Sequence, residues 1–103
     1  MRNLEFKIEG QKLTKSGDFS GIIAGTKNYL RCTFSFEDSD WNNMVKVAVF
    51  NDTKAVPIRY NICMVPDEVT DSINFKLYIV GKNGNTIVNT NKILIEQVIN
   101  NGI

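Results

Sequence analysis

Cys32 and Cys63 are the side chains of this chain best suited to act as a nucleophile or a metal ligand. The 103 residues include only these two cysteines and no histidine. A cysteine nucleophile needs a neighbouring base, most often histidine, and a structural zinc site needs four ligands, which two thiolates do not supply. The sequence therefore predicts two buried free thiols rather than a catalytic centre or a metal site.

Two acidic clusters and one glycine-containing segment are the other candidate reactive groups of the sequence. Glu37, Asp38 and Asp40 lack the alternating ligand spacing of an EF-hand loop, which favours a turn. Asp67 and Glu68 are adjacent, so on an extended chain their carboxylates point apart. The segment Gly81-Lys82-Asn83-Gly84 lacks the P-loop spacing, and Gly81-Lys82-Asn83-Gly84-Asn85 instead predicts a hairpin turn. We therefore expect no enzyme activity and no cofactor.

The charge balance narrows the classes of partner. Twelve basic and eleven acidic residues give a net charge of +1, whereas dedicated nucleic-acid binders usually carry a basic surplus. The same balance argues against electrostatic docking to a membrane, and no apolar run approaches the roughly 20 residues of a membrane span. Residues 1–5 lack the apolar core of a signal peptide. We therefore expect no export by this route and a reducing environment for the thiols.

The residues that would position any site follow a period of two. Leu4, Phe6 and Ile8 alternate with charged residues, and the segment from Leu30 to Phe36 alternates in the same way. Some seven to nine short strands recur at intervals of about 8–12 residues, which is typical of a sandwich or barrel. We predict one all-β domain over residues 1–99, an immunoglobulin-like antiparallel β-sandwich, with a frayed tail at 100–103. A small Greek-key barrel is the alternative.

Two local features refine this prediction. The segment 44–50 is β-branched with one charge, Lys46, and predicts a central strand covered on both faces. Pro57 has no N–H to donate, so its strand is expected at a sheet edge.

Several apolar and aromatic residues are expected to make the core. Trp41 precedes a strongly apolar strand, which favours packing between the sheets over a role as a partner anchor. The thiol of Cys63 is also expected to be buried. The complete set of expected core or fold-making residues is Phe34, Phe36, Trp41, Phe50, Cys63, Pro66 and Phe75.

Tyr29, Tyr78 and Val80 are the candidate interaction residues. Each falls on the opposite side of its strand from the expected core residues. If their strands lie in one sheet, these side chains form a partly apolar outer patch suited to self-assembly or docking. A second covered sheet face is the alternative.

The segment from Asn28 to Val69 also carries a distinctive order of motifs. These motifs are Asn28-Tyr29-Leu30, Phe34-Ser35-Phe36, Trp41, Lys46-Val47-Ala48-Val49-Phe50 and Cys63-Met64-Val65-Pro66-Asp67-Glu68-Val69, followed by Phe75 and Thr90-Asn91. The pattern resembles small β-sandwich proteins from the structural-gene regions, tail or baseplate, of phages of Gram-positive bacteria. Asp67 departs from the family pattern, in which an aromatic residue is expected.

The resemblance implies a non-enzymatic structural or assembly protein that acts in the virion or in the host cytoplasm. Its expected partners are other phage structural proteins and further copies of itself, because virion parts are usually symmetric and repeated. The alternative is a phage-encoded inhibitor that binds and blocks a host defence protein. A strongly acidic surface would favour that alternative, and the net charge of +1 does not provide one.

Overall fold

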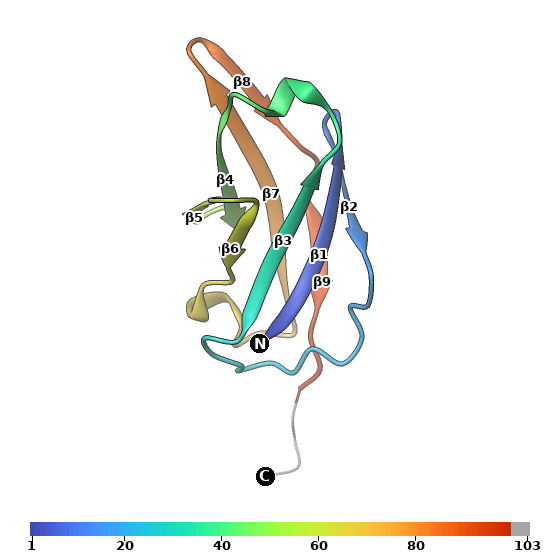
Figure 1. Cartoon of the computed structure of the whole chain (residues 1–103). Helices are drawn as coiled ribbons and strands as arrows, with labels where there is room; N and C mark the ends of the chain where they lie inside the picture. The colour runs from blue at the N-terminus through green and yellow to red at the C-terminus, as the bar shows by residue number, and fades with distance from the viewer. Residues whose placement is uncertain (100–103) are drawn as a thin grey trace.

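The computed structural model describes residues 1–99 as two β-sheets packed face to face (Figure 1). One sheet has the order β2-β1-β3-β6, and the other has the order β5-β4-β7, with β8 and β9 both paired to the remaining edge of β7. The strands are β1 (Arg2–Glu9), β2 (Lys12–Ser16), β3 (Leu30–Phe36), β4 (Val45–Phe50), β5 (Lys54–Pro57), β6 (Ile62–Met64), β7 (Asn74–Asn83), β8 (Thr86–Asn89) and β9 (Ile93–Glu96). Two single-turn 3-10 helices, η1 (Ser39–Trp41) and η2 (Asp67–Val69), lie between strands.

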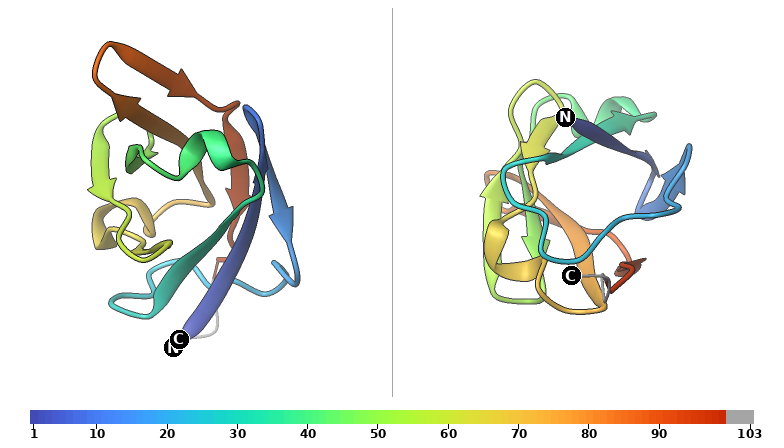
Figure 2. Two further views of the ribbon diagram at one scale, coloured as in Figure 1. Left: turned by 45° about the horizontal axis from the view of Figure 1, so that its top comes forward. Right: turned by 90° about the horizontal axis from the view of Figure 1, so that it is seen from below.

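The all-β sandwich predicted from the alternation is confirmed. The two sheets form separate layers rather than a closed barrel, because no strand ladder joins them within residues 1–99 (Figure 2). The frayed tail expected at 100–103 lies outside the described residues.

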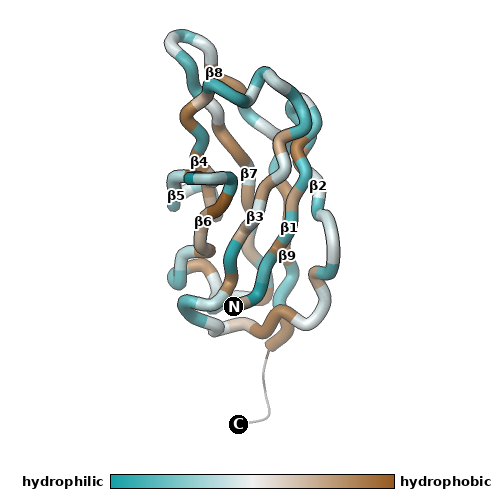
Figure 3. The backbone as a smooth tube through the Cα atoms, in the orientation of Figure 1, coloured by the Kyte–Doolittle hydropathy of each residue, from teal (hydrophilic) through white to brown (hydrophobic). Residues whose placement is uncertain are grey.

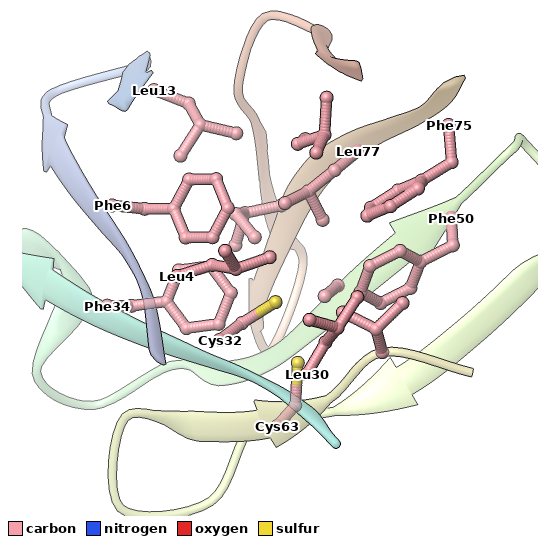
Figure 4. Close-up of a cluster of buried hydrophobic side chains, with 14 of the residues drawn as sticks. Leu4, Phe6, Leu13, Leu30, Cys32, Phe34, Phe50, Cys63, Phe75 and Leu77 are labelled. Carbon is pink, nitrogen blue, oxygen red and sulfur yellow. The ribbon is translucent and has the colours of Figure 1, made fainter. Parts of the chain in front are cut away.

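The core lies between the layers and is built from alternate residues of each strand. Hydrophilic and hydrophobic residues alternate along β1 and β3 (Figure 3). The hydrophobic residues of both strands are the buried ones. Phe6 stacks on Phe34 with ring centroids 5.3 Å apart, while Phe50 and Phe75 face them from the other sheet (Figure 4). Leu4, Ile8 and Phe75 are fully buried. Their burial removes apolar surface from water and stabilises the sandwich.

The pairing of β1 with β3 is parallel, which differs from the fully antiparallel sandwich expected. Arg2 lies opposite Leu30 and Ile8 lies opposite Phe36. The chain reaches this arrangement because residues 17–29 cross the lower end of the molecule and return β3 to the end where β1 begins (Figure 2). The Arg2 side chain holds this crossing by donating to the carbonyl of Ser20 at 2.6 Å.

The turn of the hairpin between β7 and β8 lies within the expected segment, residues 81–85, and occupies only its end. Gly81 and Lys82 continue β7, and the turn falls at Gly84 and Asn85. Gly81 stays in the strand because Trp41 of η1 packs on it: a Cβ added to Gly81 would lie 2.5 Å from Trp41 Cζ3. The short hairpin itself is as predicted, but its turn is tighter.

The pair Thr90 and Asn91 interrupts the strand that pairs with β7, and side chains replace part of the ladder there. The hydroxyl of Thr90 accepts a hydrogen bond from Ile79 N–H at 2.9 Å, and Thr90 N–H donates to the Ile79 carbonyl at 3.0 Å. The break therefore leaves Ile79, which is fully buried, with its main-chain groups satisfied.

Candidate protein-binding face

The outward faces of the two sheets differ sharply in chemistry. The four-stranded sheet presents a polar face, whose residues are Asn3, Glu5, Lys7, Glu9, Lys12, Thr14, Ser16, Arg31, Thr33 and Ser35, with Ile62 and Met64 at one edge. The five-stranded sheet presents what we call the β4–β7 face, whose apolar residues are Val45, Val47, Val49, Ala55, Pro57, Tyr78, Val80, Ile87 and Leu94. Only the second face offers a contiguous apolar surface to a partner.

Register places the apolar residues of the β4–β7 face in rows across the strands. Val47 lies opposite Val80, and Val49 lies opposite Tyr78. These four side chains are half-buried by one another, while Val45 and Ile87 at one end of the face are 75% and 60% exposed. β-Branched and aromatic cross-strand neighbours of this kind stabilise a sheet, and their outer surfaces remain open to a partner.

Charged groups surround this apolar centre. The Asp52 carboxylate forms ion pairs with Lys92, at an N–O distance of 2.9 Å, and with Lys76, at 4.0 Å. The Lys92 ammonium also lies 5.5 Å from the centroid of the Tyr78 ring. The hydrogen bond from Lys92 lowers the pKa of Asp52, and the same bond raises the pKa of Lys92. An apolar centre inside a polar rim is the usual composition of a protein interface.

Lys82 and Glu96 are the charged residues of the β4–β7 face that have no ion-pair partner among residues 1–99. Lys82 lies on β7 opposite Val45, and Glu96 lies on β9 opposite Asn74 of β7. Both side chains are exposed. They are therefore free to pair with charges on another molecule.

Three of the sheet edges, at β5, β6 and β2, are protected against the addition of another strand. β5 is an edge strand, as expected from Pro57, and ends at that residue, which has no N–H. β6 has three residues and is soon followed by Pro66, and the edge of β2 is capped by Asn91. Short, proline-terminated or covered edges discourage edge-to-edge association. The β4–β7 face, rather than one of these edges, is therefore the surface best suited to binding.

The candidate interaction residues do not come together as one patch. Tyr78 and Val80 lie on the β4–β7 face, but Tyr29 precedes β3 and belongs to the other sheet, where it is 48% exposed. The expectation of a shared outer patch is wrong for Tyr29, because the chain crosses between the layers after β3. Tyr78 and Val80 gain neighbours from β4 instead.

The sequence pattern predicted only Tyr78 and Val80 of this face, and the expectation for residues 44–50 was wrong. The apolar run 44–50 was expected to be covered on both sides. Ala48 and Phe50 point into the core, while Val45, Val47 and Val49 form the uncovered side. A strand that is β-branched on its solvent side was the available signal, and only the pairing of β4 with β7 shows which residues extend it.

The expected core residues are distributed as follows. Trp41 is 2% exposed, and its indole N–H donates to the Gly10 carbonyl at 2.9 Å. Phe36 and Pro66 are half-buried, and the Phe36 ring lies 5.1 Å from the Trp41 ring. The residues buried in the core from this set are Phe34, Trp41, Phe50, Cys63 and Phe75.

Cys32 and Cys63 lie directly opposite one another on β3 and β6 as free, buried thiols. Both thiols point into the core (Figure 4). The hydrogen bond with the Cys63 thiol, and then burial, raise the pKa of Cys32 well above its ordinary value. The protonated thiol is a weaker nucleophile than the thiolate. The two cysteines therefore act as part of the core.

Within residues 1–99, no group of three or more Cys, Asp or Glu side chains is arranged to hold a metal ion. The same residues contain no helix with the length and hydropathy of a transmembrane span. Comparison with protein-family models, with curated proteins and with solved structures found no match to this chain.

Proposed function

We propose that this chain is a non-enzymatic structural or assembly protein of a phage virion, of the tail or baseplate, and that it binds its partners through the β4–β7 face. One observation supports the binding mode: the outward side of the five-stranded sheet has a contiguous apolar centre, whereas that of the four-stranded sheet is polar and charged. A contiguous apolar patch on an otherwise polar surface is typical of a docking site. The phage assignment rests on the motif resemblance from Asn28 to Val69.

The binding mode is tested by site-specific photocrosslinking in infected cells that produce the chain. A benzophenone amino acid replaces Val80 on the β4–β7 face and, as the matched control, Thr33 on the polar face. Crosslinked partners are identified by mass spectrometry. We expect Val80 to crosslink to virion proteins and Thr33 to give no such crosslink. Equal yields from both positions, or none from Val80, would contradict the proposal.

The phage assignment has its own test. Quantitative mass spectrometry of purified virions is expected to detect the chain at many copies per particle. Absence from virions, together with a Val80 crosslink to one host protein, would instead make the chain an inhibitor of that protein.

A further inference from the structure

We infer that the β4–β7 face binds a second copy of this chain, forming a two-fold symmetric dimer whose axis passes beside Tyr78 and pairs Lys82 of each copy with Glu96 of the other. This inference rests on the proposed function and names the partner of the same face. It is carried by the positions of the two unpaired charges relative to the strand register.

Register sets Lys82 and Glu96 at equal distances from Tyr78. Lys82 follows Tyr78 on β7 by four residues, and Glu96 lies opposite Asn74, which precedes Tyr78 by four residues. At a rise of about 3.3 Å per residue, each charge is roughly 13 Å from Tyr78 along the strand, in opposite directions. A positive and a negative charge therefore lie at the two ends of one apolar face.

A two-fold axis that runs across the strands at Tyr78 exchanges these two ends. Two copies then stack face to face with their β7 strands antiparallel, and each Lys82 meets the partner's Glu96. The two pairs form together, because a contact in an isologous interface occurs twice. An axis parallel to the strands would instead place each end against itself, so that Lys82 meets Lys82.

The same arrangement places apolar residues at the centre of the interface. Tyr78 and Val49 lie in the row at the axis, and Val47 and Val80 lie in the next row. Leu94, on the other side of the axis, lies opposite Lys76 of β7 and would meet the Val80 row of the second copy. Half-buried aliphatic and aromatic side chains are then covered, with Lys82 and Glu96 at the rim. Lys76 and Lys92 lie nearer the axis, where both are already paired with Asp52.

The size of the face determines the expected affinity. Four strands spaced by about 4.8 Å and the nine residues of β7 from Asn74 to Lys82 define a face of about 19 by 26 Å. That is about 490 Å², somewhat below the roughly 600 Å² per partner at the lower limit of specific interfaces. We therefore expect a dimer with a Kd on the order of 10 μM rather than an obligate one.

Sedimentation equilibrium over a concentration series tests the dimer, and charge reversal tests its geometry. Lys82→Glu and Glu96→Lys should each weaken dimerisation about tenfold or more, because each places like charges together twice. The double variant restores opposite charges across the axis and should return to within about threefold of the wild-type Kd. Lys12→Glu, on the polar face, makes the same charge change as Lys82→Glu and should leave the Kd unchanged.

Two results would overturn the inference. One is a wild-type chain that remains monomeric well above the expected Kd, and the other is a double variant that dimerises no better than the single variants. If the chain is monomeric but Val80 still crosslinks to another virion protein, the second-copy inference fails and the proposed function stands. If Val80 also crosslinks to nothing, both fail.

Discussion

The side chain of Asn91 pairs with the main chain of Leu13 in the way that a neighbouring strand would. Its Oδ1 accepts a hydrogen bond from Leu13 N–H at 2.7 Å, and its Nδ2 donates to the Leu13 carbonyl at 3.1 Å. Leu13 lies in β2, at the edge of one sheet, and Asn91 lies in the break between β8 and β9 of the other. The Asn91 amide thus joins the two sheets along one side of the sandwich.

Removing this amide should destabilise the fold. Asn91→Ala leaves the N–H and carbonyl of Leu13 without their partners, and we expect a loss of about 1–3 kcal/mol in the free energy of unfolding. Urea denaturation measures it. Asn89→Ala is the matched control, because the Asn89 side chain makes no hydrogen bond within residues 1–99. Equal effects of the two variants would contradict the role assigned to Asn91.

The contact between Gly81 and Trp41 makes a second prediction. In Gly81→Ala the new methyl group would lie 2.5 Å from Trp41 Cζ3 and 2.7 Å from Met44 Sδ, so both side chains must shift. We expect a loss of about 1–3 kcal/mol by urea denaturation, with a changed near-ultraviolet circular dichroism signal from the single tryptophan. Thr86→Ala, exposed on the same hairpin, should change stability by less than about 0.5 kcal/mol.

Tyr60 is held in a conformation that its side chain disfavours. It occupies a two-residue turn with φ of 54° at Tyr60 and 61° at Asn61, and it is 97% exposed. Asparagine accepts positive φ more readily than tyrosine, so Tyr60→Asn should stabilise the fold by about 0.5–1 kcal/mol, seen as a higher Tm. Tyr29→Asn, exposed but at ordinary φ, should bring no such gain. A lower Tm for Tyr60→Asn would show that the tyrosine stabilises its turn.

The raised pKa of Cys32 leads to a prediction of how the stability of the fold changes at alkaline pH. The hydrogen bond with Cys63, followed by burial, raises the pKa of Cys32 in the folded state. Below about pH 8.5 the thiol is protonated in both states, so it adds no pH dependence. Above that pH the unfolded chain loses this proton first, and stability falls by up to about 1.4 kcal/mol per pH unit until the folded pKa is reached.

Urea denaturation at pH 7 and pH 9.5 measures this effect. Cys32→Ala lowers stability at both pH values, so the informative quantity is the difference between them. That difference should be smaller in Cys32→Ala than in the wild type. The same difference in both proteins would show that other groups cause the alkaline loss.

The strands could be predicted from the sequence because burial is encoded locally. Leu4, Phe6 and Ile8 point one way in any extended segment, whichever strand lies beside it. The turn at Tyr60 and Asn61 was harder to predict, because it contains no glycine. Its position depends on the bridge between Arg59 and Ile62.

Pairing could not be predicted in the same way, because it depends on residues far apart in the chain. Nothing near β1 specifies that it lies parallel to β3, and nothing near Tyr29 shows that Tyr78 belongs to the other sheet. The role of Asn91 depends on Leu13, 78 residues earlier. For the β4–β7 face, the apolar residue types could thus be predicted from the sequence, but the pairing of its strands could not.

The closure of β2 by Asn91 has a consequence for the order in which the protein is made. A ribosome synthesises Leu13 of β2 78 residues before Asn91, whose amide covers the edge of that strand. Until then, the nascent chain presents an uncovered strand edge, which is the kind of surface that promotes aggregation. We therefore expect chains truncated before residue 91 to aggregate during synthesis and the complete chain to refold efficiently after dilution from denaturant.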